Sequence, residues 1–202
     1  MKKTIHVLTV SVLLLVVCIS ATQSKSDIGL VIPDFTLRNV DGRMISSVDY
    51  NNAKGFIVIF TCNHCPFAKL YSKRMNDLNG KYSKLNIPLI AINSMDSLIY
   101  ADESFNNMQL KAKIDSFQFF YLQDATQIVG KQFKAEHTPT AYVIWKENNQ
   151  WKIKYKGAID DNGENPELAK PFIANAVDEL LQYKTVSEPE TESFGCRIFY
   201  RK

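Results

Sequence analysis

Short runs of hydrophobic residues, separated by polar turns, divide the first half of the chain into strands. Apolar and polar positions alternate over residues 34–37, and the Asp41-Gly42 step that follows is typical of a turn between two short strands. These residues predict a β-hairpin. The continuous apolar run Phe56–Phe60 is typical of a strand that is covered on both faces, so we expect a central strand that leads directly to Cys62.

A change of period after this point predicts a helix. From Pro66 onward the apolar positions recur with the spacing of one helical face, and the Asn79-Gly80 step predicts the end of the helix. Pro66 suits the first turn, because its missing N–H would have no partner there. The next apolar run, Ile87–Ile92, predicts a second buried strand. A strand–helix–strand unit of this length implies a parallel connection, which places the protein in the α/β class.

The second half of the chain continues this alternation and adds an antiparallel hairpin. Residues 94–115 are polar, with a weak helical pattern. The elements predicted after them are a strand at 117–122, a helix at 124–133 capped by Asp124, a hairpin of 140–145 and 151–155, and a closing helix at 166–183. We therefore expect a central mixed β-sheet that is flanked by helices and carries an N-terminal β-hairpin.

The N-terminus has the pattern of a secretory signal peptide. Lys2 and Lys3 precede an apolar run over residues 7–19, and small and polar residues follow. The run is shorter than the about 20 residues of a transmembrane helix, so we expect cleavage after Ala21 and export to the periplasm or cell envelope. Lipidation at Cys18 and an uncleaved signal are the alternatives that would hold the protein on a membrane. The expected organisation is a signal peptide (1–21), one domain (22–185) and a C-terminal tail (186–202).

The charge balance excludes several classes of partner. Of the 24 Lys and Arg residues, Lys2 and Lys3 leave with the signal peptide, so 22 basic residues face 21 acidic ones. A nearly neutral chain offers no basic face for nucleic acid and no acidic tract for a polycationic partner. The hydrophobic fraction of 46% is that of a folded domain.

The segment Cys62-Asn63-His64-Cys65 is the candidate site for chemistry. Between a buried strand and a helix start, the first thiol lies near unpaired backbone N–H groups, which favour the thiolate. The two-residue spacer lets Cys65 attack a mixed disulfide on Cys62 and release the partner. Cys62 is therefore the expected nucleophile and Cys65 the resolving cysteine, in exchange with the thiols and disulfides of other proteins. A static disulfide and half of a zinc site are alternatives, but a zinc site needs two further ligands and no second Cys-x-x-Cys occurs.

Two histidines remain after removal of the signal peptide. His64 stands between the cysteines, where its protonated form would stabilise a thiolate and so make the disulfide more oxidising. A solvated spacer with little effect is the alternative. His137 stands in the segment Glu136-His137-Thr138-Pro139, just before a predicted strand, where an X-Pro bond can be cis.

These features together resemble the redoxin (AhpC/TSA-like) branch of the thioredoxin superfamily. The resemblance rests on the N-terminal hairpin, the strand into the CNHCP motif (residues 62–66) and the Thr138-Pro139 strand entry, and it spans about residues 31–183. It implies a thioredoxin-like fold and says little about the substrate. We expect no cofactor and no metal. The resemblance also implies that Pro139 is cis and packs against the disulfide, while the backbone of Thr138 binds an extended segment of the substrate.

The chain departs from the thioredoxin pattern in two places. Thioredoxins commonly carry an aromatic residue before the first cysteine and a buried carboxylate on the preceding strand, but Thr61 precedes Cys62 here and the predicted strand holds no acid. Glu136 is a candidate proton acceptor, with a solvated surface role as the alternative. Cys196 lies in an apolar tail and is a candidate third redox thiol if the tail folds back. A buried structural residue and an intermolecular disulfide are its alternatives.

Two other functions share this scaffold. Peroxidases of the redoxin branch resemble one another in a threonine three residues before the reactive cysteine, and Ile59 takes that position here. Exported copper chaperones bind Cu(I) with two cysteines and a distant histidine, which would be Cys62, Cys65 and His137. Those chaperones have a three-residue spacer, whereas this chain has two residues. A thiol-disulfide oxidoreductase is therefore the leading hypothesis.

Overall fold

The computed structural model describes residues 26–50 and 52–202. The predicted signal peptide, with Cys18 and the expected cleavage point at Ala21, lies outside these residues. In the part of the chain that the structure describes, no helix is both long enough and apolar enough to cross a membrane.

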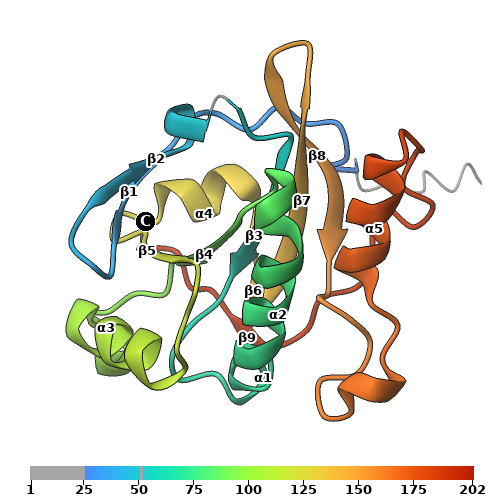
Figure 1. Ribbon diagram of the computed structural model, residues 1–202. Coiled ribbons are helices and arrows are strands. Elements are labelled where there is room, and N and C mark those ends of the chain that lie inside the picture. The colour runs from blue at the N-terminus through green and yellow to red at the C-terminus, as the bar shows by residue number, and fades with distance from the viewer. Residues whose placement is uncertain (1–25, 51) are drawn as a thin grey trace, which may run out of the picture.

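A seven-stranded mixed sheet runs through the centre of the protein (Figure 1). Its strands lie in the order β2-β1-β5-β4-β3-β7-β8. The three strands β3, β4 and β5 are parallel, and the other neighbours are antiparallel. Their bounds are β1 Thr36–Asn39, β2 Met44–Ser46, β3 Gly55–Phe60, β4 Leu89–Asn93, β5 Phe120–Gln123, β7 Thr140–Glu147 and β8 Gln150–Gly157. The predicted α/β fold with a mixed sheet and an N-terminal hairpin is confirmed.

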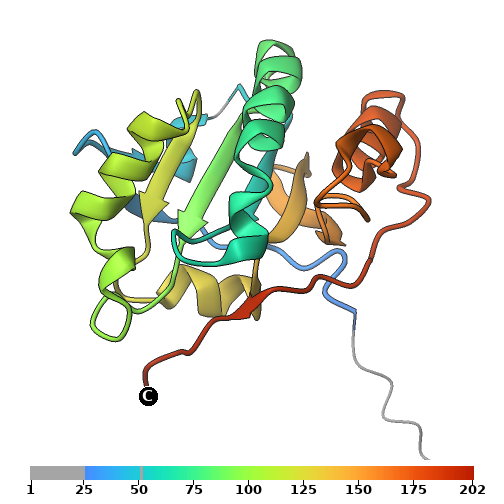
Figure 2. The same ribbon diagram turned by 90° about the horizontal axis from the view of Figure 1, so that it is seen from below.

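Helices cover both faces of the sheet. Helices α2, α3 and α5 share one apolar core with one face, while α4 and the C-terminal tail share a second core with the other face. Figure 2 shows this division, with α4 and the tail on the opposite side of the sheet from the other three helices. The helices are α1 Pro66–Lys69, α2 Ser72–Tyr82, α3 Phe105–Ile114, α4 Ile128–Phe133 and α5 Phe172–Leu181. Short 3-10 helices are η1 Ser47–Tyr50, η2 Ser83–Leu85, η3 Ala101–Glu103 and η4 Pro166–Leu168.

The continuous apolar runs explain the two central strands. Every residue of β3 and β4 is buried. Side chains of a strand point alternately to its two faces, so Val58 and Phe60 lie in the core with α4, while Ile57 and Ile59 lie in the core with α2. Burial of a side chain of this size contributes about 2 kcal/mol. A tightly packed strand therefore fixes the position of Cys62, just beyond its end.

The helix that follows the cysteines differs from the prediction. It is divided into α1 and α2, and the N–H groups in the link bond three residues back, as in a 3-10 turn. It also continues through Gly80, where we expected it to end. Tertiary hydrogen bonds explain the difference, because the buried side chain of Asn79 donates to the carbonyl of Gln118 and accepts the N–H of Leu89.

Two other helices begin later than predicted. Helix α5 begins after Pro171 and not at Pro166, because a proline within a helix lacks the N–H that the preceding turn needs. Helix α4 begins after Asp124, the expected cap. The carboxylate of Asp124 still serves the start of the helix, since it accepts the N–H of Gly130.

The C-terminal tail folds back onto the domain. Its strand β9 (Cys196–Arg197) pairs antiparallel with β6 (His137–Thr138), the short strand that precedes β7. Ile198 is buried in the core that contains α4. Figure 2 shows the tail passing beneath the sheet next to α4. The tail therefore reaches the end of the sheet at which the cysteine motif lies.

Candidate active site

The two cysteines of the motif lie where β3 ends and α1 begins. Cys62 follows β3, and Cys65 is the N-cap residue of α1, with Pro66 in its first turn as predicted. Both side chains are fully buried, and both are free thiols. The fold thus places both sulfurs at one turn of the chain, at the end of a strand that is buried throughout.

Thr138 contacts both sulfurs. Its hydroxyl lies 3.0 Å from Cys62 Sγ, and its carbonyl oxygen lies 3.2 Å from Cys65 Sγ, which donates to it as a thiol. The Thr138–Pro139 peptide bond is cis, as the resemblance implied. The structure therefore brings Cys62, Cys65 and the Thr138-Pro139 pair together at one place.

The two cysteines differ in their affinity for the proton. A hydrogen bond with Cys65 and burial raise the pKa of Cys62 far above its ordinary value, and the Glu103 carboxylate raises it further. The hydrogen bond with Cys62 lowers the pKa of Cys65 to about 4 despite burial, and the side chain of Cys196 lowers it further. With the tail bound, the negative charge therefore lies on Cys65 and not on the expected nucleophile. An ionised Cys65 gives up its bond to the Thr138 carbonyl, because a thiolate cannot donate.

A buried carboxylate fixes the loop between the cysteines. Glu103, the last residue of η3, is 1% exposed. Its oxygens accept the backbone N–H groups of Asn63 and His64, each at 3.0 Å. The side-chain amide of Asn93 and Nδ1 of His64 lie 2.6 Å from the same carboxylate. The acid that thioredoxins carry on the preceding strand is absent here, and an acid from a distant loop takes a place beside the motif.

Glu103 is the site residue that sequence reasoning missed. It lies in the polar stretch 94–115, and no local pattern separates it from its neighbour Asp102, which is exposed. Glu136, the candidate proton acceptor, is exposed to solvent. The acid beside the cysteines is therefore Glu103.

His64 is directed toward this carboxylate. Its side chain is 22% exposed, and its ring stacks on Tyr100 with 4.6 Å between the centroids and 15° between the planes. A ring nitrogen of His64, the sulfur of Cys62 and an oxygen of Glu103 lie within 4.8 Å of one another. His64 is thus placed to act on Cys62, and its protonated form would offset the field of the carboxylate there.

The same three groups are the described residues that approach one another closely enough for a metal ion. The Glu103 oxygens, however, already accept hydrogen bonds from several groups, including the ring of His64. His137 lies on β6 and is not part of this group. The Cu(I) site that would join His137 to the two cysteines is therefore not assembled within 4.8 Å in the part of the chain that the structure describes.

The tail brings the third cysteine to this site. Strand β9 pairs Cys196 with Thr138, whose hydroxyl lies 3.4 Å from the Cys196 carbonyl oxygen. Cys196 is half-buried and packs against the core that contains both motif cysteines. Burial and then the hydrogen bond with Cys65 raise the pKa of Cys196 to about 12. At neutral pH Cys196 is thus a thiol that can donate to the Cys65 thiolate.

Neither Thr61 nor Ile59 supplies a hydroxyl to the site. The Thr61 hydroxyl is fully buried and has no hydrogen-bond partner among the described residues. Ile59, at the position of the peroxidase threonine, is fully buried in the core with α2. The site therefore lacks the threonine by which the peroxidases resemble one another.

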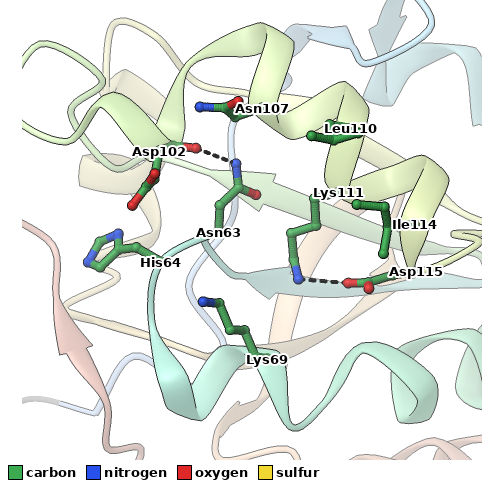
Figure 3. A pocket seen from close by; sticks show the side chains of 9 residues that line it. All are labelled: Asn63, His64, Lys69, Asp102, Asn107, Leu110, Lys111, Ile114 and Asp115. Atoms are coloured by element: carbon green, nitrogen blue, oxygen red, sulfur yellow. Dashed lines mark hydrogen bonds and ion pairs between the residues drawn. The ribbon is translucent and has the colours of Figure 1, made fainter.

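An open pocket of about 430 Å³ lies beside the motif (Figure 3). Helix α3 borders it on one side, and Asn63 and His64 border it on the other. The Asn63 amide donates to the Asp102 carbonyl, and Lys111 pairs with Asp115 at 2.7 Å. The other lining residues are Lys69, Asn107, Leu110 and Ile114. A chain bound along the motif would thus find both charged and apolar groups next to His64.

Comparison with known proteins agrees with this fold. The AhpC/TSA family model matches residues 28–155, which include the cysteine motif and Thr138 but not Cys196. No curated protein matches the chain.

Three solved structures illustrate the likeness. An uncharacterized conserved protein from Geobacillus kaustophilus is 33% identical, with a TM-score of 0.78 over 86% of this chain and 92% of that one. A hypothetical protein from Sinorhizobium meliloti 1021 is 26% identical, with a TM-score of 0.80 over 88% of this chain and 97% of that one. A thiol-disulfide oxidoreductase from Bacteroides fragilis NCTC 9343 is 18% identical, with a TM-score of 0.54 over 76% and 98%, and shows likeness of fold alone. With the family match across more than half of its length, the chain belongs to the AhpC/TSA family of the thioredoxin superfamily.

Proposed function

We propose that this protein is an exported thiol-disulfide oxidoreductase that exchanges disulfides with other proteins through Cys62 and Cys65. The observation that carries the proposal is the contact of both sulfurs with Thr138, the residue before cis-Pro139. Two thiols separated by two residues, beside a backbone segment that pairs with an extended strand, suit exchange with a polypeptide better than a static bond. The activity named for the Bacteroides fragilis neighbour agrees with this class.

The place of Cys65 at the start of α1 supports attack on Cys62. When the pair is a disulfide, a substrate thiolate that attacks the Cys62 sulfur expels Cys65, whose thiolate accepts the backbone N–H of Ala68, and a leaving thiolate that is stabilised in this way leaves faster. The Cys62–Cys65 bond breaks, a substrate–Cys62 disulfide forms, and Cys65 keeps the electron pair. A second substrate thiolate then attacks the substrate sulfur and releases Cys62, which takes up a proton. The substrate loses two electrons, and the cysteine pair gains them.

The direction that the structure favours is disulfide donation. A thiolate of lowered pKa stabilises the reduced pair, and stabilising the reduced form makes the disulfide more oxidising. We therefore expect a reduction potential that is more positive than the about −270 mV of thioredoxin.

Equilibration with glutathione tests the proposal. Purified protein is held at a series of glutathione ratios, and mass spectrometry after alkylation gives the fraction with a Cys62–Cys65 disulfide. We expect Cys62→Ser to abolish exchange with a peptide disulfide and Cys65→Ser to accumulate a mixed disulfide on Cys62. Wild-type exchange rates in the Cys62→Ser/Cys65→Ser double variant would end the proposal. A mixed disulfide that accumulates only in Cys62→Ser would reverse the roles of the two cysteines.

Export is proposed from the N-terminal pattern of charges and apolar residues. Cleavage after Ala21 predicts that the native protein begins at Thr22. N-terminal sequencing of protein from its own cells measures this directly, and a chain that begins at Met1 would contradict cleavage.

We propose a role for Cys196 as a third redox thiol, on the basis of its place beside Cys65. In that step Cys196 first gives up its proton and its sulfur attacks the Cys65 sulfur of the disulfide. A Cys65–Cys196 bond forms, the Cys62–Cys65 bond breaks, and Cys62 leaves as a thiolate that takes up the proton. Peptide mapping of the oxidised protein should find this link. Mapping that finds Cys196 free at every glutathione ratio would contradict it.

A further inference from the structure

We infer that the C-terminal segment 193–201, here called the strap, occupies the site at which an extended, cysteine-containing segment of a substrate binds. The term substrate rests on the proposed function, but the occupancy itself is tested independently below. The strap is tied to the domain by its own chain, so a substrate would have to displace it.

The strap pairs with the domain through its backbone. Strand β9 adds to the edge of β6 in antiparallel register, with Cys196 opposite Thr138 and Arg197 opposite His137. The pairing continues where the Ile198 N–H donates to the Glu136 carbonyl at 2.8 Å. Addition of an extended segment to a free strand edge is a common way to bind a peptide, because the main chain supplies the hydrogen bonds. The strap therefore lies as a bound peptide would lie.

The strap places the sulfur of Cys196 beside the motif. Cys196 is the strap residue that pairs with Thr138, and Thr138 contacts the sulfurs of Cys62 and Cys65. The side chain of Cys196 interacts with that of Cys65. A substrate cysteine must reach this place to exchange a disulfide with the motif. The strap thus presents a thiol where the reaction needs one.

The strap residues on either side of Cys196 also fit the domain closely. Phe194 packs edge-on against Phe67, with 5.6 Å between the ring centroids. Gly195 has a φ of +146°, and a Cβ there would overlap the carbonyl oxygen of Thr138. Ile198 is 3% exposed. The site therefore favours an extended segment with an aromatic residue, a glycine and a cysteine in succession, followed two residues later by an apolar side chain.

The bound strap covers the motif. Both motif sulfurs are fully buried while the strap is bound. Gln127, itself buried, anchors the strap end by donating to the Phe199 carbonyl at 2.9 Å and accepting the Arg201 N–H at 2.8 Å. A tethered strand has a high effective concentration, so it competes well with a free peptide. Reaction with an external substrate therefore requires the strap to leave.

The test lifts the strap without changing a cysteine. In Gly195→Ala the added methyl group overlaps the Thr138 carbonyl, whereas a Cβ at Gly80 on α2 meets nothing within 4 Å. Gly80→Ala is therefore the matched control. We expect Cys62 and Cys65 of reduced Gly195→Ala to be alkylated about ten to a hundred times faster than in wild type, because loss of one or two strap hydrogen bonds shifts the opening equilibrium by that factor. Gly80→Ala should be alkylated at the wild-type rate.

A probe peptide tests the identity of the occupant. It carries residues 192–201 with serine in place of Cys196, so it binds without forming a disulfide. We expect it to bind Gly195→Ala more tightly than wild type, in which the strap holds the site. Phe194→Ala provides a second variant, which removes the ring contact with Phe67. Phe194 is 51% exposed and lies outside both apolar cores, so we expect its loss to leave them unchanged.

The outcomes separate this inference from the proposed function. Wild-type alkylation rates in both strap variants overturn the inference, and so does a probe peptide that binds wild type and the variants equally or binds none of them. Faster alkylation with peptide binding, but without disulfide exchange in any variant, would confirm the occupancy and contradict the proposed function. Normal exchange with unchanged alkylation would contradict the strap alone.

Discussion

Replacement of Glu103 by glutamine tests whether this carboxylate keeps Cys62 protonated. The substitution preserves shape and removes one charge, and a Glu103 oxygen lies within 4.8 Å of the Cys62 sulfur. At an effective dielectric constant of about 20, two unit charges at that distance interact with about 3.5 kcal/mol, which corresponds to about a 300-fold change in the thiolate population. His64 contacts the same carboxylate, and its protonated form would offset part of this charge. We therefore expect Cys62 of Glu103→Gln to react about ten to a hundred times faster.

The same substitution should lower the free energy of unfolding. An amide NH₂ in place of one carboxylate oxygen would face the N–H donors of Asn63 or Asn93. Hydrogen bonds to a charged group contribute about 1.5–3 kcal/mol each, so we expect a loss of about 2–4 kcal/mol, measured by urea unfolding of the reduced protein.

The assay is the rate of iodoacetamide alkylation at neutral pH, resolved by peptide so that Cys62 and Cys65 are followed separately. The Cys62 rate should rise relative to the Cys65 rate, because the charge of Glu103 raises the pKa of Cys62. Glu136→Gln is the control, since Glu136 is an exposed carboxylate. An equal rise at both cysteines would show that the variant only opens the site. An unchanged ratio would refute the electrostatic role of Glu103.

Two further predictions concern stability and pH. Thr61→Val removes a buried hydroxyl that has no partner among the described residues and keeps the side-chain shape, so the free energy of unfolding should rise by about 1 kcal/mol. A loss of 1 kcal/mol or more in urea unfolding would contradict this. In the reduced protein the pKa of Cys65 is lowered from 9.0 to about 4. Ionisation of Cys65 therefore stabilises the fold fully above pH 9. This stabilisation decreases as the pH falls and is absent below about pH 4. Thiolate absorbance at 240 nm should therefore titrate near pH 4 in wild type and not in Cys65→Ser. Unfolding curves of wild type and Cys65→Ser should converge toward acidic pH, and parallel curves would contradict the assignment.

The parts of the fold that sequence reasoning predicted are those in which local pattern and tertiary environment agree. Strands β3 and β4 are apolar throughout and buried throughout, so their hydrophobic runs lead directly to the centre of the sheet. The cysteine motif could be predicted equally well from the sequence, because its chemistry depends only on the strand before it and the helix after it. Thr138 and Pro139 came from the family resemblance, and the cis bond there is confirmed.

The parts that were missed depend on contacts between distant segments. Asn79 reads as a helix stop, but its hydrogen bonds to Gln118 and Leu89 hold it in α2. Glu103 is one of several acids in a polar stretch, and its burial follows from how η3 packs beside the motif. Neither contact has a periodic signal, since one side chain and one long-range partner leave no repeating pattern in the sequence.

The contact between Cys196 and Cys65 links the position of the strap to the redox state. In the reduced protein the Cys65 thiolate accepts a hydrogen bond from Cys196, and this bond lowers the pKa of Cys65. By thermodynamic reciprocity, ionisation of Cys65 must strengthen strap binding by the same free energy. A Cys62–Cys65 disulfide has no thiolate to accept the bond, so the strap should be released more readily from the oxidised protein, which is the form that a substrate thiol must reach. Hydrogen exchange of the Ile198 amide, which bonds to Glu136 across the strap, should therefore be faster in the oxidised protein than in the reduced one. Equal or slower exchange would show that strap and disulfide are not coupled.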